Sequence, residues 1–170
     1  LMIGGKIQNY RNILRRYIRD YGENEDVNRA IYVLEHAKRD VLVAQDKTTL
    51  IGYEGMASNA YFEVLPVLIL NQKVDFPFYG RNRRPPKDAV NAMLSFAYTL
   101  IANDVSAALE TIGLDPYVGF LHTLRPGRTS LALDMMEELR AYLGDRFVLS
   151  LINKRQITAK DFLFQGDNGV

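Results

Sequence analysis

Residues 3–18 read IGGKIQNYRNILRRYI, and this stretch decides the fold class of the 170-residue chain. Its apolar side chains recur at steps of three and four residues, at Ile3, Ile7, Tyr10, Ile13, Leu14, Tyr17 and Ile18. This spacing places them on one face of an α-helix and leaves the arginines largely on the other face. We therefore predict an amphipathic helix that ends near residues 21–24.

The same helical period continues along the chain. A second helix is predicted over residues 27–37, with Asp26 able to cap it, and a third from about residue 46 to residue 65. The longest apolar-periodic segment covers residues 89–112, and Gly113 terminates it.

The C-terminal third predicts further helices. One extends over residues 131–143, and Thr129 or Ser130 can cap it. An apolar run follows at residues 147–152, and a short helix is expected near residues 157–162. The chain contains no Rossmann glycine fingerprint, P-loop or internal repeat. The prediction is an all-α fold, a compact multi-helix domain.

Composition bounds the class of protein. A length of 170 residues suits one domain, residues 1–170, and 48% apolar residues suffice for a core. The absence of cysteine excludes disulfides and thiolate zinc sites and agrees with a cytoplasmic protein. No apolar run approaches the roughly 20 residues that span a bilayer, so we expect no membrane contact. The chain does not begin with Met, and we expect it to be a piece of a longer protein.

Residues 71–87 interrupt the helical rhythm with three prolines, three aromatic residues and five basic residues. The segment is typical of a loop whose basic side chains hold phosphates; the candidates are Arg81, Arg83, Arg84 and Lys87. The interleaved aromatics can stack on exposed bases; these are Phe76, Phe78 and Tyr79. The alternative is that Pro77, Phe78 and Pro85 pack the loop onto the core.

Three residues far apart in the chain, Glu54, His122 and Glu137, are candidates to bind one divalent metal ion. Each lies beside apolar residues, where an unpaired charge is costly. Two carboxylates and an imidazole suit magnesium or manganese and leave positions for a phosphate oxygen. Asp134 lies three residues before Glu137, so it can face the same side of a helix as a fourth ligand or as a supporting group. Taken singly, a glutamate on a helix is usually a solvated face residue, and a lone histidine after an apolar pair is more often a core or interface residue than a ligand.

Several segments together make the chain similar to a known family. They are residues 53–57 (YEGMA), 83–96 (RRPPKDAVNAMLSF), 113–122 (GLDPYVGFLH), 125–128 (RPGR) and 130–138 (SLALDMMEE). In this order the chain resembles the helical catalytic domain of the CRISPR-associated spacer integrases, the Cas-one family. The resemblance covers about residues 44–154.

The resemblance implies a function and a site. It implies metal-dependent cleavage of double-stranded DNA and strand transfer, by which captured spacer DNA is joined into a CRISPR array in antiviral defence. It assigns Glu54, His122 and Glu137 as ligands of Mg²⁺ or Mn²⁺, with Asp134 in support, and we expect Arg125 and Arg128 to contact DNA phosphates beside the 71–87 loop.

The resemblance also implies partners. Members of the family bind a small Cas-two protein and form a homodimer through an N-terminal β-rich domain, which nothing in this chain matches. The residues by themselves leave two other functions open. One is a helical nucleic-acid- or protein-binding module without chemistry of its own, and the other is an unrelated metal phosphohydrolase.

Overall fold

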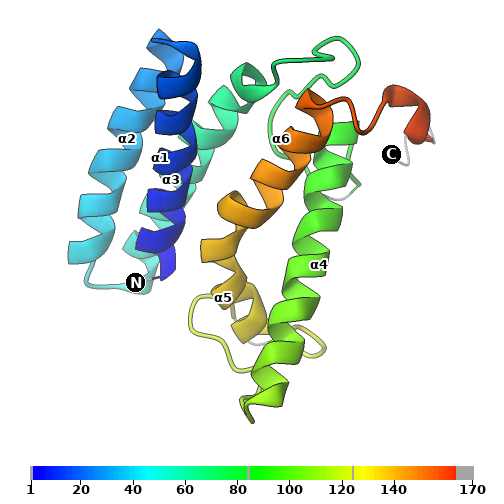
Figure 1. Cartoon of the computed structure of the whole chain (residues 1–170). Helices are drawn as coiled ribbons and strands as arrows, with labels where there is room; N and C mark the ends of the chain where they lie inside the picture. The colour runs from blue at the N-terminus through cyan, green and yellow to red at the C-terminus, as the bar shows by residue number, and fades with distance from the viewer. Residues whose placement is uncertain (1, 84, 124, 164–170) are drawn as a thin grey trace.

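The computed structural model describes residues 2–83, 85–123 and 125–163, and all regular elements in these ranges are helical (Figure 1). In chain order they are α1 (Met2–Tyr21), α2 (Glu25–Val43), α3 (Lys47–Leu68), α4 (Ala89–Thr111), α5 (Ser130–Leu139), the π-helical segment η1 (Arg140–Asp145), α6 (Arg146–Asn153) and the short 3-10 helix η2 (Ala159–Asp161). The predicted all-α class is confirmed for these residues. In Figure 1, α1, α2 and α3 form one group, and α4 lies alongside α5 and α6 as a second. Helix α1 contacts α5 and η1, where the two groups meet.

Short polar side chains begin three of the long helices. The Asn24 side chain accepts a hydrogen bond from the backbone N–H of Val27 at the start of α2, and Asp46 and Asp88 cap α3 and α4 in the same way. The prediction that Asp26 caps the second helix is therefore wrong. Asp26 lies in the first turn instead, where its charge is favourable beside the helix N-terminus.

The structure joins two segments that the sequence separates. The helix predicted to end at about Leu143 and the apolar run that follows it form one continuous rod, because α5 continues through η1 into α6. The start also differs from the prediction. Thr129 makes no capping hydrogen bond, and the Ser130 hydroxyl instead donates to the Thr123 carbonyl oxygen.

The π-helical segment depends on close packing against α4. A Cβ atom added to Gly144 would lie 2.9 Å from Cε1 of Tyr98, so only glycine allows this approach. Tyr98 in turn donates a hydrogen bond to Asp145 at the end of η1. The wider turn places a glycine and a buried acid against one tyrosine. Such π-helical turns inside α-helices are frequent at functional sites.

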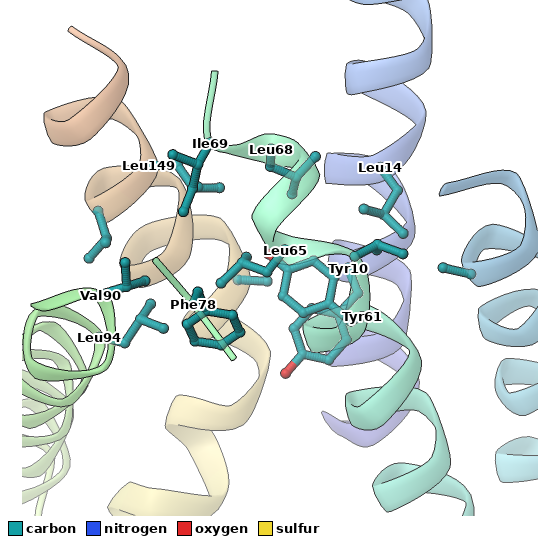
Figure 2. Close-up of a cluster of buried hydrophobic side chains, with 14 of the residues drawn as sticks. Tyr10, Leu14, Tyr61, Leu65, Leu68, Ile69, Phe78, Val90, Leu94 and Leu149 are labelled. Carbon is teal, nitrogen blue, oxygen red and sulfur yellow. The ribbon is translucent and has the colours of Figure 1, made fainter. Parts of the chain in front are cut away.

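The buried core takes residues from all six α-helices and from the loop after α3, and part of it is drawn in Figure 2. Tyr10 of α1 stacks on Tyr61 of α3, with ring centroids 3.9 Å apart and an interplanar angle of 15°. Leu65 and Phe78 lie between this stack and Leu94 of α4 in the same view. Stacked aromatic pairs of this kind add to the stability that comes from burial alone.

The aromatic residues of the 71–87 loop serve the core more than the surface. Phe76 and Phe78 are 1% and 5% exposed, so the prediction that they stack on bases is wrong. They bury apolar area against the helices, which holds the loop down. Tyr79, by contrast, is 91% exposed and is the one aromatic of this set that a base can reach.

Helix α4 meets the length and composition criteria for crossing a membrane, so the expectation that no run approaches them is wrong. A core helix can meet the same two criteria. Its buried residues include Met93, Leu94 and Tyr98, and it packs against α5, η1 and α6. We therefore assign α4 to the core of the fold.

Candidate metal and nucleic-acid site

Glu54 of α3 and Glu137 of α5 converge on a single buried cation, Lys6 of α1. The Lys6 Nζ atom lies 2.7 Å from Oε2 of Glu137 and forms a salt bridge with Oε1 of Glu54. Lys6 is only 2% exposed. The structure thus brings together two of the three predicted metal ligands, and it does so around a positive charge.

Glu54 and Lys6 each stabilise the charged form of the other. Burial would raise the pKa of Glu54, but the Lys6 ammonium and a 2.8 Å hydrogen bond from the Ser58 hydroxyl lower it below its ordinary value. Burial would lower the pKa of Lys6, and the neighbouring Tyr10 and the two glutamates raise it above its ordinary value. Glu54 and Lys6 therefore carry opposite charges at neutral pH.

Arginine completes the charge balance around Glu137. Arg140 of η1 places Nη2 3.0 Å from Oε1 of Glu137, one helical turn away on the same rod. The Arg140 guanidinium also lies 4.9 Å from the ring centroid of Tyr98. Each carboxylate oxygen of Glu137 therefore has its own cationic neighbour, and this pairing allows the side chain to be buried.

His122 is held by Asp134 rather than by the glutamates. Nδ1 of His122 lies 2.6 Å from Oδ1 of Asp134. Because an ionised carboxylate only accepts hydrogen bonds, Nδ1 carries the proton, and Nε2 of the neutral ring keeps its lone pair. This arrangement orients metal-ligating histidines in many proteins.

Asp134 also fixes the loop that delivers His122. Its Oδ2 accepts from the backbone N–H of Phe120 and Leu121 at 2.5 and 2.8 Å, and its Oδ1 accepts from the backbone N–H of His122 at 3.0 Å. Although burial would raise it, the pKa of Asp134 is lowered by the hydrogen bonds from Leu121, His122 and Phe120. With both oxygens engaged in this way, Asp134 occupies a supporting position around His122.

The loop approaches helix α5 too closely for a side chain at Gly119. A Cβ atom there would lie 2.7 Å from the backbone carbon of Ser130 and 2.8 Å from Oδ2 of Asp134. The glycine in the GFLH segment therefore allows the backbone N–H groups to reach the carboxylate. Gly119 thus allows the loop before His122 to pack directly against α5.

The four predicted site residues form two pairs. Glu54 and Glu137 meet at Lys6, and His122 meets Asp134; the two acids of α5 lie one helical turn apart. Within the described ranges, no group of three potential ligands is arranged as a metal site. The donor set nevertheless fits Mg²⁺ or Mn²⁺, because two carboxylates already converge on a cation and an oriented imidazole keeps one nitrogen lone pair.

His122 opens onto a large basic pocket of about 870 Å³. Arginines from three separate segments line it, namely Arg81, Arg83, Arg125, Arg128 and Arg140. The folded chain therefore gathers the mid-chain loop and the loop after His122 around one histidine. Guanidinium groups bind phosphate oxygens in pairs, so the pocket suits a phosphodiester backbone.

The remaining predicted basic residues are placed differently. Lys87 lines a second hollow of about 480 Å³, together with Asp75 and Asp88, and it does not line the basic pocket. Arg84 lies outside the described residues. Arg81 has a structural task as well, since it donates hydrogen bonds to Asn91 and Ser95 of α4. Part of the basic loop therefore anchors itself to the fold.

Sequence reasoning missed Lys6, Arg140 and Asp145. One signal for Lys6 was present, because it shares the helical face of Ile3, Ile7 and Tyr10, where a lysine has to be paired. For the other two, the contacts with Tyr98 of α4 depend on tertiary packing, whereas the pairing of Arg140 with Glu137 is local.

Asp145 is a fully buried acid behind the glutamates. It is 0% exposed, and burial raises its pKa to about 6, although the hydrogen bond from Tyr98 and the charges of Arg140 and Lys6 act in the opposite direction. Its ionisation near neutral pH therefore costs folding free energy.

Replacing Asp145 with asparagine is expected to remove part of the pH dependence of stability. The folded pKa of about 6 exceeds the ordinary value of 3.8, so the stabilisation by this carboxyl is present below about pH 4 and is lost as the pH rises through 6. At about 1.4 kcal/mol per pKa unit, the wild type should lose roughly 3 kcal/mol relative to Asp145→Asn between about pH 4 and pH 7. Urea unfolding at both pH values measures this difference; a constant difference would contradict the assignment.

Comparison with known proteins finds one family model and several relatives that match this chain. The family model described as CRISPR associated protein Cas1 matches residues 1–170. The CRISPR-associated endonuclease Cas1 1 of Chlorobaculum tepidum is 52% identical over 165 residues, which are 95% of this chain and 48% of that protein. The CRISPR-associated endonuclease Cas1 of Leptospira interrogans is 46% identical over 165 residues, 95% of this chain and 65% of that protein. The chain thus spans about half to two thirds of the length of these relatives.

Solved structures share the helical arrangement. A CAS1 protein from Thermotoga maritima superposes with a TM-score of 0.79 at 27% identity, over 99% of this chain and 50% of that one. A Cas6-RT-Cas1–Cas2 complex gives a TM-score of 0.83 at 28% identity, over 98% of this chain and 18% of that one. A casposase bound to integration product gives 0.77 at 28% identity, over 99% of this chain and 45% of that one.

Proposed function

The chain belongs to the CRISPR-associated Cas1 family, and on this premise we propose that it is the catalytic helical part of a metal-dependent DNA endonuclease and integrase. The observation that carries the proposal is the convergence of Glu54 and Glu137 on one buried cation, and a histidine held by Asp134 of the same helix as Glu137 supports it. These residues come from α3, from α5 and from the loop before α5, so only the folded chain brings them into two pairs. The relatives named as endonucleases support the same reaction class.

The substrate follows from the pocket. Five arginines line a hollow that also contains His122, and a DNA backbone presents phosphates at regular spacing to such a surface. Arg125 and Arg128 follow His122 directly in sequence, so they would hold the phosphate next to the reacting one. Tyr79, exposed on the neighbouring loop, can stack on an unpaired base.

The residues divide the chemistry among them. Glu54, Glu137 and Nε2 of His122 would hold Mg²⁺ or Mn²⁺, which when bound neutralises a phosphate oxygen and activates the attacking hydroxyl. Asp134 keeps the proton of His122 on Nδ1, and Arg140 fixes Glu137. In strand transfer the 3′ oxygen of a captured fragment bonds to phosphorus, the bond from phosphorus to the leaving oxygen breaks, and that oxygen takes up a proton. The pocket arginines position the phosphate for this exchange.

The assembly is also part of the proposal. One solved neighbour is a complex that contains Cas1 and Cas2, which supports a small Cas2 partner for the protein to which this chain belongs. A casposase neighbour was solved with an integration product, which supports strand transfer as the reaction. We propose a homodimer that engages Cas2 and joins spacer DNA into a CRISPR array.

Metal removal tests the function directly. With labelled double-stranded DNA and Mn²⁺ or Mg²⁺, the protein is expected to cleave and join strands, and excess EDTA should abolish both reactions because Glu54 and Glu137 then have no divalent ion to present. Gel analysis of the products measures cleavage and joining separately. Binding of DNA should weaken with salt and persist in EDTA.

The same assay separates the alternatives. A binding module without chemistry gives salt-sensitive DNA binding and no product with any metal. An unrelated metal phosphohydrolase gives turnover of a small phosphoester and no joined DNA. Either pattern would overturn the proposed function.

A further inference from the structure

Lys6 takes the position between the two carboxylates that the proposed function assigns to a divalent ion. Three helices each supply one member of the cluster: Lys6 from α1, Glu54 from α3 and Glu137 from α5. The lysine is 2% exposed, and its ammonium contacts one oxygen of each glutamate. A lysine rarely occupies such a position unless its charge is needed there.

The cluster requires a cation to stay folded. Without one, two carboxylates would face each other inside the protein, and like charges in a low-dielectric region repel strongly. Of the two glutamates, Arg140 forms its salt bridge with Glu137, at 3.0 Å, whereas Lys6 forms salt bridges with both. The ammonium thus keeps Glu54 and Glu137 together when no metal is bound.

We propose that Lys6 is an internal stand-in cation, which preorganises Glu54 and Glu137 and gives way when a divalent ion binds to them. The inference rests on the proposed function, since it assumes that these glutamates are metal ligands. A divalent ion and an ammonium that share the same oxygens repel each other, so one has to leave. Lys6 therefore sets the affinity for metal as a competitor.

The Tyr10 ring offers the Lys6 ammonium a contact other than the two glutamates. The lysine side chain is a flexible four-carbon stem, and the Tyr10 ring one turn further along α1 lies 5.7 Å from Nζ. The face of an aromatic ring attracts an ammonium, so a small rotation keeps the charge paired while it frees the carboxylates.

Lys6→Met tests the competition, with Lys38→Met as a matched control. Lys38 also loses one charge, but its Nζ donates to Gln8 at 2.6 Å and not to either glutamate. Isothermal titration with Mn²⁺ is expected to show at least about tenfold tighter binding for Lys6→Met, because the competing charge is gone. The metal-free melting temperature of Lys6→Met should fall, and its rise on adding Mn²⁺ should exceed that of the wild type. Lys38→Met should match the wild type in affinity and in the rise.

The outcomes separate this inference from the function on which it rests. Equal Mn²⁺ affinity in wild type and Lys6→Met, or weaker affinity in the variant, overturns the stand-in role alone. Absence of Mn²⁺ binding in every protein overturns the proposed function and this inference together. If Lys6→Met does not fold, Lys6→Gln replaces it, since an amide still donates hydrogen bonds to both carboxylates. In the wild type, the ¹⁵N resonance of the Lys6 ammonium should shift on adding Mg²⁺, and an unchanged resonance counts against displacement.

Discussion

Replacing His122 with alanine is expected to lower DNA cleavage and strand transfer by about 100-fold or more, while DNA affinity changes little. The imidazole is oriented by a 2.6 Å hydrogen bond from Nδ1 to Asp134, which leaves Nε2 free to act toward a metal ion. Groups that merely orient a metal ligand already contribute about 10- to 100-fold, so removing the ligand itself belongs at the upper end of that range or beyond it. The arginines that hold phosphates are untouched.

The second histidine supplies the control. His36 is exposed on α2, and its Nδ1 lies 2.9 Å from the backbone oxygen of Tyr32, within its own helix. His36→Ala should retain wild-type cleavage, joining and DNA affinity. Rates are measured on labelled DNA with saturating Mn²⁺, and affinity by fluorescence anisotropy in EDTA. Wild-type rates in His122→Ala would rule out the assigned role of this residue.

Replacing Asp134 with alanine is expected to destabilise the fold by about 3–5 kcal/mol. The carboxylate is 0% exposed, and it accepts three backbone N–H bonds from residues 120–122 together with the His122 ring. Alanine leaves these partly buried donors without their acceptor, and each unsatisfied donor is costly. Urea unfolding followed by circular dichroism measures the loss. Asp104→Ala, at an exposed position of α4, should change stability by less than about 0.5 kcal/mol.

Asparagine at position 134 separates stability from chemistry. Its carbonyl oxygen can still accept from Phe120 and Leu121, so Asp134→Asn should unfold at a urea concentration between those of wild type and Asp134→Ala. Its amide donates toward Nδ1 of His122, which moves the ring proton to Nε2 and removes the lone pair that a metal needs. The DNA cleavage rate of Asp134→Asn should therefore fall strongly, although its free energy of unfolding falls less than that of Asp134→Ala. An Asp134→Asn protein with full activity would show that the tautomer of His122 does not matter.

Local sequence determined most of the helices, because the interactions involved reach only three or four residues along the chain. The period of residues 3–18 predicted α1, and the run over residues 89–112 predicted α4 to within one residue at its C-terminal end. The caps are local as well, yet the prediction for α2 chose Asp26 where the structure uses Asn24. Both residues are chemically able to cap, and the choice between two neighbouring polar residues depends on backbone angles that the sequence does not display.

The sequence also identified the candidate site residues by their chemistry, but it did not predict which of them are in contact. Glu54, His122, Asp134 and Glu137 stood out as charged or polar groups among apolar neighbours, and the family resemblance gave a reason to expect a shared site. Only the packing of α1, α3 and α5 shows that Lys6 lies between two of these acids. Contacts between separate helices depend on crossing angles and on how side chains interlock, which no local period encodes.

The same limit explains the remaining differences. Phe76 and Phe78 are buried in the core, and Gly144 of η1 packs closely on Tyr98 of α4. The sequence by itself therefore determined the all-α class, the helices and the candidate residues, since these follow from local periodicity and side-chain chemistry. The tertiary structure decided which charges meet, that five arginines share a pocket with His122, and that a lysine holds the two glutamates together. These features arise from burial and from contacts between segments far apart in the chain.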